Sequence, residues 1–236
     1  MKNSKLDVLY EDNHIIAINK NNSDLVQADI SGDEPLNERV KKYIKNKYNK
    51  PGDVFLGVPH RLDRPVSGVV IFARTSKALT RLNKMFQEKD KEIDKIYWAI
   101  VNTQPPLEEE VLTHYILRNS EKNKSSAYNK EKKGAKEASL EYKLICRSQK
   151  YYLLEVKLHT GRHHQIRCQL AKIGCPIKGD LKYGFPRSNK DGGISLHARQ
   201  ISFMHPVKKE KITITAPVPQ SDNLWKEFIK MLELKY

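Results

Sequence analysis

Short strand-like runs and amphipathic helical segments alternate along the whole of this 236-residue chain. Strands are predicted at residues 6–20 (two strands around a turn), 96–101, 138–146, 151–158, 201–204 and 212–216, and the apolar run that follows Asp63 also has strand character. Helices are predicted after Pro35, after a cap at Ser76, at 163–173 and at 222–234. Because no internal repeat and no linker divides these elements, the pattern predicts one α+β domain over residues 1–236.

The chain has a formal net charge of +15, from 43 basic and 28 acidic residues. This imbalance favours a polyanionic partner, of which nucleic acid is the commonest, although a surface adapted for solubility is the alternative. The segment 119–137 is rich in Lys, Glu, Ser and Asn, which predicts an exposed, mobile basic loop that could contact phosphates. A charge-rich hairpin tip is an equally good interpretation of the same residues.

The three cysteines, Cys146, Cys168 and Cys175, form no C-x-x-C pair. We expect them to be reduced thiols that fill space inside a cytoplasmic protein. No segment reaches the length of a membrane span, and the N-terminus lacks an apolar core of signal-peptide length. The sequence therefore predicts a soluble cytoplasmic protein with no membrane partner.

One carboxylate has an unusual setting, in the segment H-R-L-D-R-P-V-S-G-V at residues 60–69. Asp63 lies between Arg61 and Arg64, at the edge of an apolar run with strand character. Neighbouring cations favour the ionised form of a carboxylate, and they also attract phosphate. The alternative is a turn aspartate that simply pairs with one of the two arginines.

A second dense segment, L-H-T-G-R-H-H-Q-I-R-C-Q-L, spans residues 158–170. Further short motifs are E-D-N at 11–13, I-N-K at 18–20, K-I-Y-W-A-I-V at 95–101, G-C-P-I at 174–177, G-D at 179–180, Y-G at 183–184, L-H-A at 196–198 and F-M-H-P at 203–206. Together with the Asp63 segment, these motifs resemble those of the RluA family of pseudouridine synthases, in unchanged order from about residue 6 to residue 218. The chain departs from that pattern at Asn21, where the family has proline, and at Gln169, where it usually has histidine.

The resemblance implies a single mixed, mainly antiparallel sheet flanked by helices, and it assigns catalytic roles to three residues. Asp63 would be the catalytic carboxylate, and Arg162 would form a salt bridge that holds it ionised and oriented. Tyr97 would lie under the target uracil and could move the proton at C5. Without the resemblance, Arg162 could cap a helix or bind phosphate, and Tyr97 could simply pack on the sheet.

The neighbours of these residues are expected to contact RNA or to support Asp63 and Arg162. They are His60, Arg61, Arg64, His164 and Arg167. A zinc site made of His159, His163 and His164 is the less favoured alternative, because no acidic or cysteine ligand lies at suitable spacing and adjacent histidines diverge on a helix. We expect no metal and no cofactor, and we expect the pair Asp180 and Tyr183 to form a structural turn.

The reaction implied by the resemblance breaks the N1–C1′ bond of a uridine in tRNA or large-subunit rRNA, rotates the base and rejoins it through C5. A uracil anion leaves with its charge spread over its carbonyls, so one carboxylate could suffice where glycoside hydrolysis normally needs two. The pattern starts within ten residues of Met1, so we expect the catalytic domain alone, with no N-terminal S4 domain. We also expect a monomer. The alternatives are a non-catalytic RNA-binding or ribosome-assembly protein and a nucleic-acid glycosylase.

Overall fold

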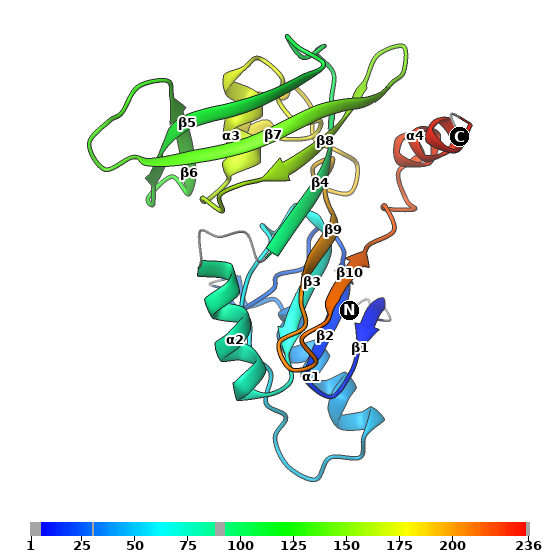
Figure 1. Ribbon diagram of the computed structural model, residues 1–236. Helices are drawn as coiled ribbons and strands as arrows, with labels where there is room; N and C mark the ends of the chain where they lie inside the picture. Colours follow the sequence, from blue (N-terminus) through cyan, green and yellow to red (C-terminus); the bar gives the residue numbers. More distant parts are fainter. Residues whose placement is uncertain (1–5, 30, 88–92, 235–236) are drawn as a thin grey trace. The chain divides into compact units, whose positions relative to one another are not determined.

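The computed structural model describes residues 6–29, 31–87 and 93–234 (Figure 1). In chain order the strands are β1 Val8–Glu11, β2 Ile15–Lys20, β3 Ser67–Ala73, β4 Ile93–Val101, β5 Glu109–Asn119, β6 Lys124–Tyr128, β7 Lys136–Arg147, β8 Tyr152–Leu158, β9 Leu196–Met204 and β10 Lys211–Thr215. The helices are α1 Leu36–Lys47, α2 Ser76–Gln87, α3 Gln165–Lys172 and α4 Asn223–Glu233, with a 3₁₀ turn, η1, at Leu181–Tyr183. None of the helices in this described part of the chain is long and apolar enough to cross a membrane.

The strands form one sheet in the order β1-β2-β3-β9-β4-β8-β7-β5-β6, with β10 paired to β9. The pairings whose registers are defined, for example β2 with β3 and β7 with β8, are antiparallel. The predicted α+β class with a mainly antiparallel sheet is therefore confirmed. The chain divides into two compact units, Met1–Asp94 with Arg199–Pro217 and Lys95–Ala198 with Val218–Tyr236, and β4 and β9 contribute residues to both. The single domain predicted over residues 1–236 stays a prediction.

The first unit is built around the buried strand β3. It pairs with β2 from Ile15 opposite Ala73 to Lys20 opposite Gly68, and all of its residues are buried. Helix α2 lies beside β3 (Figure 1). Its cap is one residue earlier than predicted, because the Thr75 hydroxyl rather than Ser76 accepts the Ala78 N–H, at 3.2 Å. Thr75 and Ser76 are both good helix caps by sequence, and only the backbone geometry shows which of them is the cap.

The second unit contains the ladder β4-β8-β7-β5-β6. Asp222 caps helix α4, because its carboxylate accepts the Leu224 N–H at 2.9 Å, and the helix buries Trp225 and Phe228 against Trp98. Helix α3 packs against β5 and β6 instead. The cysteines, Cys146, Cys168 and Cys175, are free and buried, as the sequence predicts.

Part of the segment 119–137 differs from the predicted loop. Residues 124–128 form β6, which pairs with β5 from Tyr115 opposite Tyr128 to Asn119 opposite Lys124 (Figure 1). Ser125 on this strand is only 1% exposed. The loop prediction is wrong for these residues, and the hairpin interpretation is the one that the structure has. Polar strands pair through their backbones, so composition alone gives no sign of them.

Candidate active site

Asp63 lies half-buried in the tight turn that leads into β3. The carbonyl of Asp63 accepts the Val66 N–H at 3.0 Å, and the carbonyl of Arg64 accepts the Ser23 N–H at 3.0 Å. Arg61 is exposed, and so is Arg64, whose guanidinium pairs with Asp33. The turn therefore has a fixed backbone with cationic side chains on its outer side.

A buried ammonium group binds the backbone of this turn. Lys20, at the end of β2, is 1% exposed, and its Nζ donates to the carbonyls of Asn21 at 2.8 Å, Arg64 at 3.0 Å and Val66 at 2.7 Å. An ammonium group has three donors, so these three carbonyls use all of them. Burial lowers the pKa of Lys20 to about 7, against the opposing charges of Asp24 and Asp63.

Lys20 is a residue that the site prediction missed, although the motif I-N-K contains it. A lysine after a strand usually points to solvent, and the sequence carries no signal that this one turns inward. The departure at Asn21 is harmless to the contact. Asparagine offers the same backbone carbonyl as the proline of the family pattern.

His60 supports the other side of the Asp63 turn. Its Nε2 accepts the N–H of Ile71 on β3 at 2.9 Å, and its ring stacks on Phe86 of α2 with 4.6 Å between ring centroids. In this contact the Nε2 atom of His60 serves as a hydrogen-bond acceptor. We conclude that the residue joins strand, turn and helix in the first unit.

Tyr97 lies in the middle of β4, opposite Val156 of β8, and is half-buried. Its neighbour Trp98 packs with the α4 cluster, so strand alternation places Tyr97 on the other face of β4. Lys95 shares the Tyr97 face, and burial lowers the pKa of its ammonium group. The Lys95 Nζ lies close to Gly161, where an added Cβ would be 3.6 Å away. Strand β4 thus approaches the turn that carries Arg162.

The Arg162 turn is held by a buried amide rather than by a charge. The Gln165 Oε1 accepts the Arg162 N–H at 2.9 Å and the Thr160 hydroxyl at 2.8 Å, while its Nε2 donates to the Ser139 carbonyl at 3.0 Å. The side chain of Arg162 is exposed, and its Nε donates to the Glu137 carbonyl at 3.0 Å. Gln165 is part of the motif at residues 158–170, but the sequence did not predict it as a site residue.

His164 and Arg167 lie inside the second unit, where they support the turn. His164 has a left-handed backbone with φ of 52°, and its Nδ1 lies 2.9 Å from the Tyr183 hydroxyl. Burial lowers the pKa of His164 to about 2, and the charge of Arg167 acts in the same direction. Arg167 pairs with Asp180 through two bonds of 2.7 and 2.9 Å, and both side chains are buried.

This buried pairing with Asp180 is what the supporting role expected for Arg167 needs, and a role of Arg167 toward RNA stays a prediction. The bidentate pair buries both side chains and holds the Arg167 guanidinium in one orientation. Asp180 and Tyr183 form a structural turn, as expected. The motif departure Gln169 is also internal, because its Nε2 donates to the Leu112 carbonyl at 3.1 Å and lies 3.1 Å from His114 Nδ1.

The three histidines of the zinc alternative go to different partners. His159 lies 3.7 Å from Glu141, and His163 lies 2.9 Å from the Ser125 hydroxyl. His164 meets Tyr183 as described above. Among residues 6–29, 31–87 and 93–234, no three acidic, histidine or cysteine side chains are grouped so that they could hold a metal ion.

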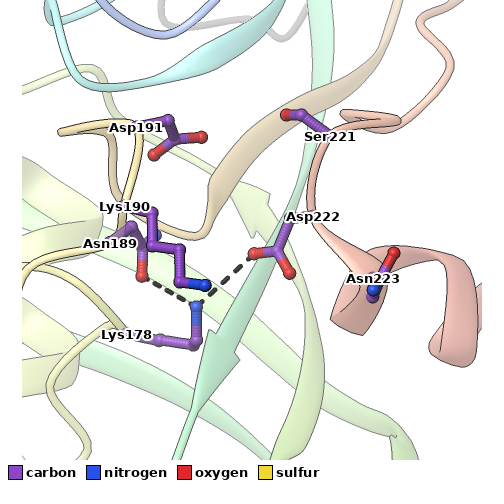
Figure 2. Close-up of a pocket in the computed structure, with 7 residues that line it drawn as sticks. All are labelled: Lys178, Asn189, Lys190, Asp191, Ser221, Asp222 and Asn223. Atoms are coloured by element: carbon purple, nitrogen blue, oxygen red, sulfur yellow. Dashed lines mark hydrogen bonds and ion pairs between the residues drawn. The ribbon is translucent and has the colours of Figure 1, made fainter.

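Figure 2 shows a pocket of about 470 Å³ in the second unit. Its lining residues are Lys178, Asn189, Lys190, Asp191, Ser221, Asp222 and Asn223. The Lys178 Nζ donates to Asn189 at 2.7 Å and lies 3.4 Å from the Asp222 carboxylate. The two lysines and two aspartates balance in charge, so the pocket has no preference for an anion, and Lys178 serves to fasten the start of α4.

The predicted site residues fall on both compact units. Asp63 and His60 belong to the first, and Tyr97 and Arg162 to the second. Within each unit the predicted residues lie in turns or strands with defined supports. The predicted salt bridge between Arg162 and Asp63 would pair a residue of one unit with a residue of the other, and it stays a prediction.

Comparison with known proteins identifies the family. Residues 14–172, more than half of the chain, match the RNA pseudouridylate synthase family. The chain is 32% identical over 238 residues to the ribosomal large subunit pseudouridine synthase C of Buchnera aphidicola subsp. Schizaphis graminum, which covers 98% of this chain and 72% of that protein. The chain belongs to the RluA family of RNA pseudouridine synthases. It is therefore an isomerase that acts on RNA.

Two further matches bear on length and fold. The tRNA pseudouridine synthase C of Vibrio parahaemolyticus is 28% identical over 247 residues, covering 97% of this chain and 96% of that protein. The solved structure of human RNA pseudouridylate synthase domain containing 4 superimposes with a TM-score of 0.76 at 21% identity, covering 96% of this synthase and 93% of the human chain. The fold is thus that of pseudouridine synthases.

Proposed function

We propose that this synthase uses Asp63 as its catalytic carboxylate to convert a uridine of tRNA or large-subunit rRNA into pseudouridine. The observation that carries the proposal is the buried Lys20, whose ammonium group binds the carbonyls of Arg64 and Val66, the residues that follow Asp63 in its turn. A fixed turn that presents one half-buried carboxylate is what a reaction at a glycosidic carbon needs. The two substrate classes are those named for relatives at 32% and 28% identity.

In the proposed reaction the N1–C1′ bond breaks, the base rotates, and a C5–C1′ bond forms. The proton on C5 is then lost, and N1 gains one, so the product is an isomer with no net change in redox state and no water consumed. This balance explains why no cofactor is needed. Asp63 acts in its ionised form, and Arg162 would keep it ionised and oriented through a bidentate pair.

Tyr97 is proposed to lie under the target base. An aromatic ring supplies a stacking surface for a uracil that has been flipped out of folded RNA. Its hydroxyl is an acid–base group that could move the C5 proton. The location of Tyr97 on the face of β4 away from the α4 cluster supports this role, because that face also carries Lys95 near the Arg162 turn.

We further propose that the enzyme works as a monomer in the cytoplasm. The formal charge of +15 supports binding of folded RNA through its phosphates. Arg61 and Arg64, exposed beside Asp63, are proposed to contact the RNA near the target nucleotide.

The test is tritium release from RNA that carries uridine labelled at C5. Unmodified tRNA and large-subunit rRNA transcripts are incubated separately with wild type and with Asp63→Asn. We expect release by the wild type alone, with RNA binding retained in the variant because the substitution also removes charge repulsion with phosphate. If Asp63→Asn loses RNA binding, and its turnover falls only as far as that weaker binding explains, Asp63 would not be catalytic. Free uracil in the wild-type reaction would indicate a glycosylase.

A further inference from the structure

A group of exposed cations surrounds the β5–β6 hairpin in the second unit. We call Arg118, Lys124 and Lys182 the hairpin surface. Lys182 Nζ donates to the Asn123 carbonyl at 3.0 Å, and Lys124 Nζ lies 5.3 Å from the centre of the Tyr183 ring. Arg118, one residue before the end of β5, lies opposite Ser125 in the β5–β6 pairing and so beside Lys124, and its charge, like that of Lys182, helps to lower the pKa of His164. The three cations therefore converge on one place.

The hairpin is fastened to the body of the unit at its tip. The Ser125 N–H donates to the Tyr183 hydroxyl at 2.8 Å, and the Ser125 hydroxyl donates to the His163 carbonyl at 2.8 Å. The side chain of Asn123 lies 3.1 Å from His163 Nε2. A surface built on such contacts needs little ordering when a ligand binds, unlike a mobile loop.

The hairpin surface keeps its positive charge. None of its three cations forms an ion pair within the described parts of the chain, 6–29, 31–87 and 93–234. Glu121, in the turn between β5 and β6, is exposed and is followed by Lys122, so the turn itself is neutral. Of the residues beneath the surface, His164 is uncharged and Arg167 is neutralised by Asp180.

The hairpin surface is continuous with the turn that carries Arg162. His163, which binds Ser125 and Asn123, directly follows Arg162, and Arg162 itself donates to the Glu137 carbonyl opposite Tyr115 of β5. A flipped nucleotide leaves its flanking backbone on the protein surface next to the active site. Phosphate contacts there set the register of the RNA without reading its sequence.

We propose that Arg118, Lys124 and Lys182 bind RNA phosphates next to the target uridine and so position the substrate against Arg162. This rests on the proposed function for the identity of the target, but the phosphate binding itself can be measured without turnover. Because such contacts read no sequence, any structured RNA serves as a probe. Here the probe is an unmodified tRNA transcript.

The experiment measures the dissociation constant of the transcript as a function of KCl concentration. The test variant carries Arg118→Gln, Lys124→Gln and Lys182→Gln. The control variant has the same net charge and removes exposed lysines elsewhere in the same unit, with Lys150→Gln, Lys226→Gln and Lys230→Gln. A third variant, with Arg118→Lys, Lys124→Arg and Lys182→Arg, keeps the charges and reports whether the hairpin tolerates substitution.

Each lost phosphate contact lowers the magnitude of the slope of log K against log salt concentration by about 0.7–0.9, so the slope of the test variant should be smaller by about 2. The test variant should therefore bind the transcript on the order of 10²-fold more weakly at 0.1 M salt. The charge-retaining variant and the control should keep the wild-type slope. An equal loss in test and control variants would overturn the proposal, because it would reflect net charge alone. An unchanged slope in the test variant would overturn it as well.

Tritium release measured on the same proteins separates the two proposals. A wild type that binds through the hairpin surface but releases no tritium from either RNA class would remove the proposed function and leave the surface standing. If the wild type releases tritium and the test variant binds RNA normally, the proposal for the hairpin surface is refuted and the proposed function stands.

Discussion

Two turns carry the residues proposed for the chemistry, and they are stabilised by different contacts. The Asp63 turn rests on the ammonium of Lys20, which is buried and binds three backbone carbonyls. The Arg162 turn rests on the neutral amide of Gln165, with the hairpin docked beside it. One turn therefore depends on a titratable charge, and the other does not.

The difference indicates which property each turn needs. The Asp63 turn couples a carboxylate to a buried amine, because the charge of Asp63 favours the protonated form of Lys20. An arginine is charged at any ordinary pH, so its turn needs only geometry. The same comparison predicts that perturbing the two turns will have different consequences for rate, stability and pH dependence.

The largest effect on rate, apart from loss of Asp63 itself, should come from Arg162→Lys. Lysine keeps the charge but lacks the two-pronged geometry that a carboxylate matches. We expect the single-turnover rate to fall about 100-fold, which corresponds to about 2.7 kcal/mol of transition-state stabilisation. Arg147→Lys, at an exposed arginine of the same unit, is the matched control. Near-normal activity of Arg162→Lys would refute the salt-bridge role.

The largest effect on stability should come from Arg167→Met. Removing the arginine leaves the Asp180 carboxylate buried without its partner, which typically costs about 3–5 kcal/mol. Urea denaturation measures the loss. Lys143→Met breaks an exposed pair with Glu109 and should cost less than about 1 kcal/mol. A loss of similar size in both variants would mean that the buried pair is no support for the Arg162 turn.

Lys20→Met should remove a pH dependence that the Arg162 turn does not have. The pKa of Lys20 falls from 10.5 in the unfolded chain to about 7 on folding. Between these values the unfolded chain binds more protons than the folded protein, so the free energy of unfolding should rise with pH across this window. Lys20→Met should abolish its contribution to that rise.

Gln165→Met is the matched comparison for this prediction. It leaves buried partners without a hydrogen bond and should lower the free energy of unfolding by about 1–3 kcal/mol at every pH. Urea denaturation at pH 7 and pH 9 measures both variants. A pH slope in Lys20→Met equal to that of the wild type would show that Lys20 is not the titrating group.

The smallest effect should come from Ser125→Ala, which removes the hydroxyl bonds from the hairpin tip to His163. The Ser125 N–H still binds Tyr183, so we expect a loss of about 1 kcal/mol in the free energy of unfolding. Ser126→Ala, exposed on the same strand, is the control and should change little. Equal values for the two would mean that the hairpin is held by its backbone alone.

The sequence predicted the elements whose apolar residues follow a clear period. Strands β2 and β3 and helices α1, α2 and α4 are of this kind, because each buries an apolar face or run. Strands β5 and β6 were both missed, and β6 gave no apolar pattern because its residues are polar and it pairs through the backbone. The motif resemblance located Asp63, Tyr97 and Arg162, but it could not tell which charged neighbours are buried.

Lys20 and Arg167 illustrate that limit. Both are cations in strongly basic surroundings, and a sequence reader expects such residues to face solvent or RNA. Their partners, backbone carbonyls in one case and an aspartate 13 residues away in the other, come together only in the folded chain. Burial of a charge depends on tertiary structure, so no local sequence pattern predicts it.

The measurement that tests the two-turn account most directly is a crystal structure of the enzyme, inspected at Asp63 and Arg162. We predict that the guanidinium of Arg162 and the carboxylate of Asp63 form a bidentate pair, with N–O distances below about 4 Å. A structure in which Arg162 binds elsewhere, and another cation or none pairs with Asp63, would contradict the claim that the two turns build one active site.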